Sequence, residues 1–234
     1  MSSVATSITA PTIVALLPMK HESKRVPNKN HRDFNNGKPL FHSVLKAIND
    51  SKYITKTLVD TDSPVIMEYI AEHFPDVMVI ARPDHLLNDP PMTEILVHDS
   101  SCIEADYFFQ THSTNPFLST ATIDDAIGKF LGEDGRAYNS LFSVNQLQTR
   151  LYDELGRAMN HNPNVLLRTQ DLPPVYEENS CMYVFPRDVL LKRHSRIGDR
   201  AMMYVMKNRV ETVDIDTMED WNHAQHLLAQ GILE

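Results

Sequence analysis

The sequence predicts an α/β fold built on a mostly parallel β-sheet with helices on its faces. Short apolar stretches typical of buried strands alternate with segments of helical periodicity, at intervals of roughly 20–30 residues, over about the first 145 residues. Parallel strands need long crossover connections, usually helices, so this alternation indicates βαβ units. The length of 234 residues, with 42% apolar and 23% charged side chains, is compatible with one large globular domain.

The elements of the alternating region follow from local patterns. Apolar runs predict five strands, at 13–17, 57–59, 77–81, 105–110 and 141–145. Apolar residues at helical spacing predict four helices, at 41–49, 64–73, 93–101 and 122–131. Ser63 and Pro64 fit the N-cap and first turn of the second helix, and Thr120 or Thr122 is expected to cap the fourth.

The alternation ends near residue 146. The remaining patterns predict short strands at 151–155, 164–167, 180–185 and 211–215, and helices at 188–192 and 218–228. The Met-rich stretch 201–206 (AMMYVM) has no clear period, and it either packs on its own domain or needs a partner surface. We expect a flexible tail at 1–11 and a single domain at 12–234, with a protruding dimerisation arm around 186–208 and hence a homodimer.

Composition excludes several classes of protein. The net charge of −9 disfavours nonspecific binding to nucleic acid. No apolar stretch reaches the roughly 18 residues of a transmembrane helix, and the first residues lack the positive start of a secretory signal. Two distant cysteines make neither a disulfide framework nor a zinc pattern. We therefore expect a cytoplasmic protein that binds neither membrane nor nucleic acid.

A cationic loop directly follows the first predicted strand. Lys20, Lys24, Arg25 and Lys29 lie within ten residues of one another, immediately after an apolar run. In an open α/β sheet, ligands bind beyond the carboxyl ends of the strands, so the charge pattern favours a polyphosphate at this loop. A solvated turn is the alternative from charge alone. The loop has no glycine and no G-x-x-x-x-G-K-[ST] pattern, which argues against a P-loop kinase or ATPase.

An acidic pair lies near the carboxyl end of the chain. Asp214 and Asp216 flank Ile215, and strand alternation would put both carboxylates on one face with Ile215 in the core. Two carboxylates this close repel each other unless a cation lies between them, and their hard oxygen atoms favour magnesium. A D-x-D pattern alone is also common on exposed strand surfaces.

Five ordered motifs give the chain a family resemblance. They are S-K-R-x-P-x-K-N at 23–30 with G-K-P-L at 37–40, the Thr61-Asp62 turn, Arg82-Pro83 with Asp89, QTHSTNPFL at 110–118, and QDLPPVY at 170–176, and the acidic pair extends them as V-D-I-D-T-x-E-D at 213–220. Over residues 12–228 the chain resembles the acylneuraminate cytidylyltransferases. The resemblance implies a Rossmann-like, nucleotide-diphospho-sugar transferase-like fold and magnesium-dependent transfer of CMP from CTP to an acidic acceptor.

The resemblance also implies roles for individual residues. It implies catalytic roles for Lys24, Lys29 and Asp216, and a magnesium site at Asp214 and Asp216. The nucleotide-binding residues that it implies are Lys20, Ser23, Lys24, Asn30, Arg82 and Asp89. The acceptor-binding residues that it implies are Gln110, Arg168, Gln170 and Tyr183.

Three departures from the family pattern bear on the acceptor. Lys20 stands where sialic-acid members have arginine, Glu22 adds a negative charge, and Thr169 replaces an arginine, with Arg168 one position earlier. A nonulosonic (sialic-type) 2-keto sugar acid is the first hypothesis for the acceptor. A phosphonate or another small anionic acid is the second. The third hypothesis is a nucleotide-binding protein without catalysis, motivated by Glu22 in the phosphate loop.

Overall fold

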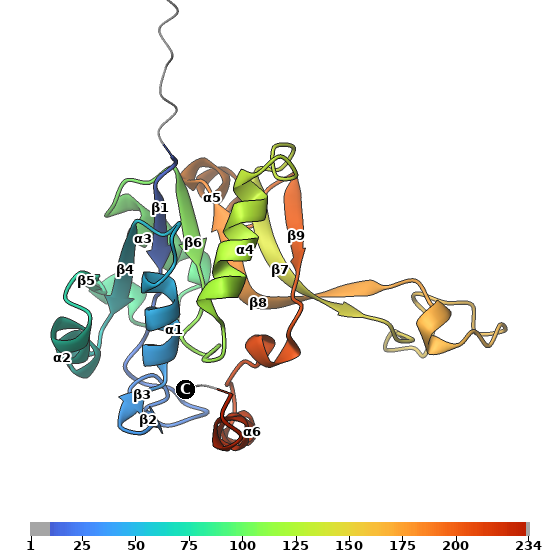
Figure 1. The fold of residues 1–234 in the computed structure, drawn as a ribbon, viewed down its shortest axis with the longest axis horizontal. Helices are drawn as coiled ribbons and strands as arrows, with labels where there is room; N and C mark the ends of the chain where they lie inside the picture. The colour runs from blue at the N-terminus through green and yellow to red at the C-terminus, as the bar shows by residue number, and fades with distance from the viewer. Residues whose placement is uncertain (1–9, 233–234) are drawn as a thin grey trace, which may run out of the picture.

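The computed structural model describes residues 10–232, which form a central seven-stranded sheet with helices on both faces (Figure 1). The strand order is β5-β4-β1-β6-β8-β7-β9, and β2 and β3 form a separate two-stranded sheet. The strands are β1 (Ile13–Leu16), β2 (Asp33–Asn35), β3 (Lys38–Pro39), β4 (Lys56–Thr61), β5 (Met78–Ala81), β6 (Tyr107–Gln110), β7 (Ser140–Leu147), β8 (Val175–Phe185) and β9 (Ala201–Val205). The helices are α1 (Phe41–Asn49), α2 (Pro64–His73), α3 (Met92–Ser101), α4 (Thr120–Leu131), α5 (Arg187–Arg193) and α6 (Met218–Ala229).

Most strand pairs in the large sheet are parallel. Strand β1 pairs in parallel with β4 and β6, β4 pairs with β5, and β7 pairs with β9. Only β8 runs against its neighbours β6 and β7. The mostly parallel sheet flanked by helices that the sequence predicts is confirmed.

Strand β1 is buried on both faces, because helices cover the sheet from each side. Ile13 and Ala15 belong to one apolar cluster, while Val14 and Leu16 belong to another. Figure 1 shows α1 and α4 on the near face and α3 and α5 behind the sheet. Burial on both faces explains why this strand is a continuous apolar run rather than an alternating one.

The parallel arrangement brings the loops that follow β1, β4, β5 and β6 to one edge of the sheet. At this edge α6 and the β2–β3 hairpin build a third, smaller core, which includes Val26, Phe34, Ile215 and Trp221. Phe34 packs edge-on against the Trp221 ring, with centroids 5.3 Å apart. This core brings the last part of the chain beside the loop that follows the first strand.

Helix starts follow local chemistry. Ser63 caps α2 by accepting a hydrogen bond from the Ile66 amide, with Pro64 in the first turn, as predicted. Ser119 caps α4, so the prediction of Thr120 or Thr122 as its cap is wrong by one or more residues. Thr217 caps α6 as predicted, and Asp220 completes a reciprocal capping box.

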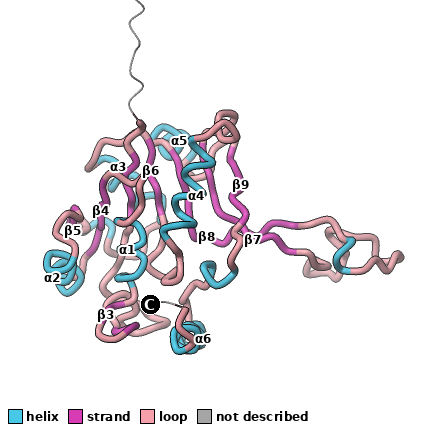
Figure 2. Tube along the Cα trace, in the orientation of Figure 1, coloured by secondary structure: helices cyan, strands magenta, loops and turns pink. Residues whose placement is uncertain are grey.

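The protruding segment differs from the one that the sequence predicts. Residues 186–208 do not form an arm, because α5 packs on the sheet and β9 is its edge strand, paired with β7. The segment that projects is the excursion between β7 and β8, which extends away from the sheet in Figures 1 and 2. The Met-rich stretch 201–206 instead contributes to the main apolar core, in which Tyr204 and Met206 are buried.

Three further predicted strands are absent from the structure. Residues 151–155 and 164–167 form no strands, and the pairing there is limited to a single bridge between Tyr152 and Ala158. Residues 211–215 are not a strand either, since a short 3-10 helix (Arg209–Thr212) leads into an irregular segment.

The tail predicted at 1–11 lies mostly outside the described residues. Within residues 10–232, no helix is both long and apolar enough to cross a lipid bilayer.

Candidate functional site

A cleft lies at the carboxyl edge of the sheet, between the loop after β1 and the loop that joins β5 to α3. One hollow of about 230 Å³ is lined by Lys29, Asn30, Arg82 and other residues. A second hollow of about 670 Å³ includes Lys24 in its lining, and Lys20 and Asp89 border both hollows. The carboxyl edge is the position at which open α/β sheets bind ligands.

The cationic loop and the acidic segment meet at Lys29. The Lys29 Nζ atom donates a hydrogen bond of 2.7 Å to the Ile215 carbonyl oxygen and lies 3.4 Å from Asp216 Oδ1. Arg25 reaches the same Asp216 oxygen from the other side, at 2.8 Å. Burial lowers the pKa of Lys29, and the nearby Asp216 carboxylate opposes that shift. Residues about 190 positions apart therefore share one site.

In the outer part of the cleft, Asp89 is the acid that binds the lysines of the cationic loop. Asp89 accepts hydrogen bonds from both Lys20 and Lys24, and these bonds lower the pKa of the Asp89 carboxyl. The Lys24 side chain remains 89% exposed, so it is available to a ligand. Asp89 bridges the two lysines in the structure. Asp89 is therefore a counter-ion of Lys20 and Lys24. The contact with nucleotide that the sequence predicts for Asp89 stays a prediction.

Hydrogen bonds fix the shape of the cationic loop. The Asn30 side chain donates to the Lys20 carbonyl oxygen and accepts from Ser113 Oγ, each at 2.7 Å. The His21 amide donates to Asp62 at the end of β4. Asn30 therefore fastens the loop to its neighbours. The structure gives Ser23 no hydrogen bond within residues 10–232, and the nucleotide contacts predicted for both residues stay predictions.

A buried ion pair supports the floor of the cleft. Arg82 lines the cleft and pairs with Asp60, and both side chains are almost fully buried. Asp99 on α3 lies beside Asp60, and within the described residues no N–H or O–H group donates to either of its carboxylate oxygens. Burial, with the negative charge of Asp60 adding to it, raises the pKa of Asp99 to about 9. Asp99 is therefore a neutral acid at pH 7, and its proton can bridge to Asp60.

The predicted acceptor residues divide into two groups. Gln110 and Tyr183 are buried register partners on adjacent strands β6 and β8, and Gln110 contacts His112, which lines the cleft at what we call its inner end. Arg168 and Gln170 lie on the excursion between β7 and β8, where Arg168 pairs with Asp171 at 2.7 Å. Because that excursion projects away from the sheet (Figure 1), the structure does not bring these two residues to the cleft of their own chain.

Two residues at the inner end were missed by the sequence analysis. His112 lines the cleft, and Arg196 reaches it from the loop between α5 and β9, with its Nη1 atom 3.4 Å from His112 Nε2. Burial, together with the charges of Arg196 and Lys29, lowers the pKa of His112 to about 4, so His112 is neutral at pH 7. No local pattern marks Arg196, because it is near Gln110 only through the fold.

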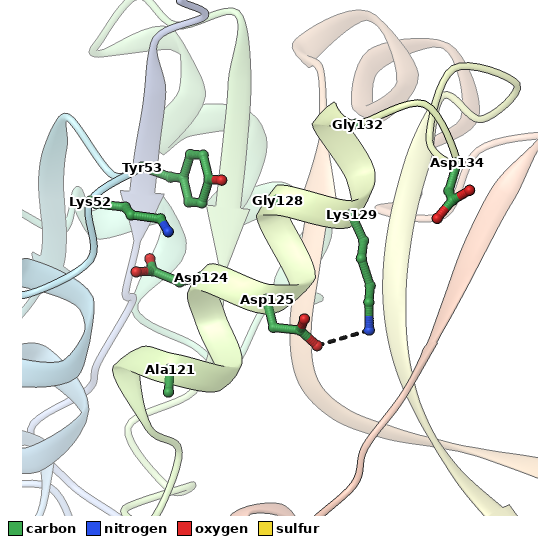
Figure 3. Close-up of a pocket in the computed structure, with 9 residues that line it drawn as sticks. All are labelled: Lys52, Tyr53, Ala121, Asp124, Asp125, Gly128, Lys129, Gly132 and Asp134. Carbon is green, nitrogen blue, oxygen red and sulfur yellow. Dashed lines mark hydrogen bonds and ion pairs between the residues drawn. The ribbon is translucent and has the colours of Figure 1, made fainter.

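Another hollow, of about 620 Å³, lies on the α4 side of the molecule (Figure 3). Lys52, Asp124, Asp125 and Lys129 are among the residues that line it, and Lys129 pairs with Asp125 at 2.9 Å. It extends to Gly132 at the end of α4, which is the amino-terminal edge of the sheet. This edge is opposite to the one that the cationic loop occupies, so the hollow is not part of the candidate site.

Comparisons with known proteins agree with this geometry. Residues 14–232 match the family model described as cytidylyltransferase. The chain belongs to the cytidylyltransferase family. It is 27% identical over 218 residues to an N-acylneuraminate cytidylyltransferase of Streptococcus agalactiae serotype V, covering 90% of this chain but 52% of that protein. The chain thus spans about half the length of that relative.

Two other comparisons cover nearly the whole of both chains. A CMP-N,N'-diacetyllegionaminic acid synthase of Legionella pneumophila is 26% identical over 233 residues, which is 92% of this chain and 96% of the relative. The solved structure of a CMP:2-keto-3-deoxy-manno-octonic acid synthetase complexed with CTP has a TM-score of 0.68, with 16% identity and coverage of 94% and 99%. The structural likeness confirms the nucleotidyltransferase type of fold.

The acidic pair suits a divalent cation by its donor set and its charge. Burial raises the pKa of Asp214, and the carboxylates of Asp216 and Asp220 add to that effect, while a hydrogen bond with Thr114 and the charge of Lys29 oppose it. A cation at this point would relieve the repulsion, and carboxylate oxygens are ligands that magnesium prefers. The two residues therefore fit a magnesium site, although they lie in an irregular segment rather than on the predicted strand.

The Asp99 assignment predicts a pH dependence of stability. Between the ordinary value of 3.8 and about 9, the folded protein holds a proton at Asp99 that the unfolded chain releases. Stability should therefore fall as pH rises through this window, by up to about 1.4 kcal/mol per pH unit. Asp99→Asn keeps the shape and a donor but cannot ionise, so its stability relative to the wild type should rise steadily from pH 5 to pH 8.

Urea unfolding at several pH values measures this difference. Asp134→Asn, a change in an exposed loop, controls for the loss of one carboxylate. A constant difference between Asp99→Asn and the wild type from pH 5 to pH 8 would contradict a protonated Asp99.

Proposed function

We propose that this chain transfers CMP from CTP to an acidic acceptor, a 2-keto sugar acid of the nonulosonic type, and releases pyrophosphate. The observation that carries the proposal is the meeting of Lys29 with Asp216 at the carboxyl edge of the sheet, 3.4 Å apart. The named activities of the S. agalactiae and L. pneumophila relatives support it. They also support a sugar acid as the acceptor, since both relatives are named for such acids.

The reaction needs positioning and charge stabilisation more than covalent chemistry. An oxygen of the acceptor attacks the α-phosphorus of CTP, and the bond from that phosphorus to the bridging oxygen of the β-phosphate breaks. Lys20 and Lys24 would bind the departing phosphates in place of Asp89, to which both are now bonded. Lys29 would neutralise charge beside Asp216, and its partial burial strengthens that interaction.

The acidic pair would hold magnesium. Asp214 and Asp216 would supply carboxylate ligands, and the bound ion would supply charge neutralisation and orientation of phosphate and acceptor oxygens. Asp216 accepts hydrogen bonds from Arg25 and Lys29 in the structure, so these cations orient the carboxylate. The neutral state of His112 avoids a further positive charge between Lys29 and Arg196.

We also propose that the chain forms a homodimer through the β7–β8 excursion. This segment exposes many apolar side chains, with 92% of Leu166, 70% of Leu155 and 65% of Met159 accessible. Such exposure is typical of a surface that packs on a partner. The excursion also carries Arg168 and Gln170, which lie outside the cleft of their own chain and could contribute to an acceptor site only from a neighbouring subunit.

The activity is tested by pyrophosphate release. With CTP, magnesium and a panel of acids, the wild type should release pyrophosphate with N-acetylneuraminate or a related 2-keto sugar acid, and EDTA should abolish the release until magnesium is restored. Release with phosphonates and none with any sugar acid would support the second hypothesis, in which the acceptor is a phosphonate. No release from any acid, with CTP bound normally in calorimetry, would support the third hypothesis, a nucleotide-binding protein without catalysis.

The metal assignment predicts a large effect of Asp216→Asn. The amide keeps the size of the side chain and an oxygen acceptor for Lys29, but it loses the charge that holds magnesium. The value of kcat should fall at least about 100-fold, while the circular dichroism spectrum and melting temperature stay close to those of the wild type. Glu219→Gln removes an exposed charge from the same turn and should retain activity. Full activity of Asp216→Asn would contradict the assignment.

The proposed dimer contact predicts that charged side chains on the excursion separate the two subunits. Wild-type protein at micromolar concentration should sediment as a dimer, and the double change Leu155→Glu/Leu166→Glu should sediment as a monomer, because two charges cannot be buried in an apolar contact. Leu191→Glu, at a 47% exposed position on α5, is the matched control and should remain dimeric. A monomeric wild type would overturn the proposed dimer.

A further inference from the structure

The guanidinium of Arg196 has no acidic partner. Within residues 10–232, no carboxylate lies within ion-pair distance of it, although the side chain is mostly enclosed and its burial lowers the pKa of Arg196. It lies flat over the Tyr183 ring, 3.6 Å from the ring centroid. The negative charge of Glu178, which binds the Tyr183 hydroxyl, acts on the guanidinium without pairing with it, so the cation remains available to an anionic ligand.

Within the described residues, the hydrogen bonds of Arg196 involve only one of its guanidinium nitrogens, Nη1. Nη1 donates to Gln110 Oε1 and lies 3.4 Å from His112 Nε2. The Nε and Nη2 atoms have no hydrogen-bond partner within the described part of the chain. These two N–H groups form the edge that binds the two oxygens of an acid group side by side. Gln110 and Tyr183 therefore orient a donor edge to which no residue among 10–232 is bonded.

This edge is adjacent to the nucleotide cleft. His112 contacts Arg196 and also lines the hollow that contains Lys29, Asn30 and Arg82. Lys29 and His112 line the same hollow, and the charges of Lys29 and Arg196 both act on the histidine, so His112 is near both cations. An acid group at Arg196 would thus lie one side chain away from the phosphates of CTP.

We propose that Arg196 binds the acid group of the acceptor and, with Gln110 and His112, determines which acids the enzyme accepts. This inference rests on the proposed function for the identity of the ligand as the acceptor. One guanidinium balances one negative charge, which matches a carboxylate. A phosphonate dianion would bring a second charge toward Glu178, whose carboxylate binds the Tyr183 hydroxyl beneath the same guanidinium. Carboxylic acids are therefore the preferred class.

The test separates binding of the acceptor from binding of CTP. In the pyrophosphate assay with N-acetylneuraminate, Arg196→Gln should raise the acceptor KM by about 10- to 100-fold, while the KM for CTP changes less than about twofold. Arg196→Lys should recover part of the loss, because it keeps the charge without the fork. Arg200→Gln is the matched control, since Arg200 is an exposed arginine on the same loop. It should behave as the wild type.

Two outcomes would overturn the inference. One is an acceptor KM for Arg196→Gln equal to that of Arg200→Gln. The other is an equal rise of both KM values with a lower melting temperature, which would give Arg196 a purely structural role. Better turnover of 2-hydroxyethylphosphonate than of the sugar acid by the wild type would overturn the preference for a carboxylate.

A binding measurement keeps the inference testable if no acid supports turnover. In that case the proposed function fails, and thermal shift with millimolar N-acetylneuraminate decides the role of Arg196. Stabilisation of the wild type and of Arg200→Gln, but not of Arg196→Gln, would support an acid-binding site there. No difference between the variants would overturn it.

Discussion

The contact between Lys29 and the segment from Ile215 to Asp216 joins the two ends of the chain at one point. The lysine bonds a backbone carbonyl and approaches a carboxylate, so it fixes both the path and the charge of the late segment. The Lys29 side chain is only 11% exposed, so burial disfavours an isolated charge there, whereas the Asp216 side chain is 43% exposed. The small core of α6 and the β2–β3 hairpin holds the two segments in register, with Ile215 fully buried in it.

Charge is arranged in layers along the cleft. Lys20 and Lys24 at the outer end share Asp89, a surface acid that a polyphosphate can displace. Lys29 and Arg25 share Asp216 in the middle, and Arg196 at the inner end has no carboxylate at ion-pair distance within residues 10–232, although the charge of Glu178 acts on it. This arrangement suits two anionic ligands that must be brought together despite their mutual repulsion, because each meets its own cation.

The sequence predicted the parts of this site that depend on local pattern. Strand β1 and helix α1 follow from apolar periodicity, and the loop between them follows from its charges. The D-x-D pattern selected Asp214 and Asp216 as candidates but assigned them to a strand, because a strand and an irregular segment with one buried side chain give the same alternation. Arg196 could not be predicted, since its environment consists of side chains from β6 and β8. The position of the arm was also beyond local pattern: the Met-rich stretch resembles an exposed surface, yet it is an edge strand of the sheet.

A crystal structure of the chain with CTP and magnesium tests the central claim most directly. The account predicts a triphosphate bound between Lys24 and Lys29, with Asp89 displaced from the lysines and a divalent ion coordinated by Asp214 and Asp216. A triphosphate bound elsewhere, or an ion with neither aspartate among its ligands, would contradict it.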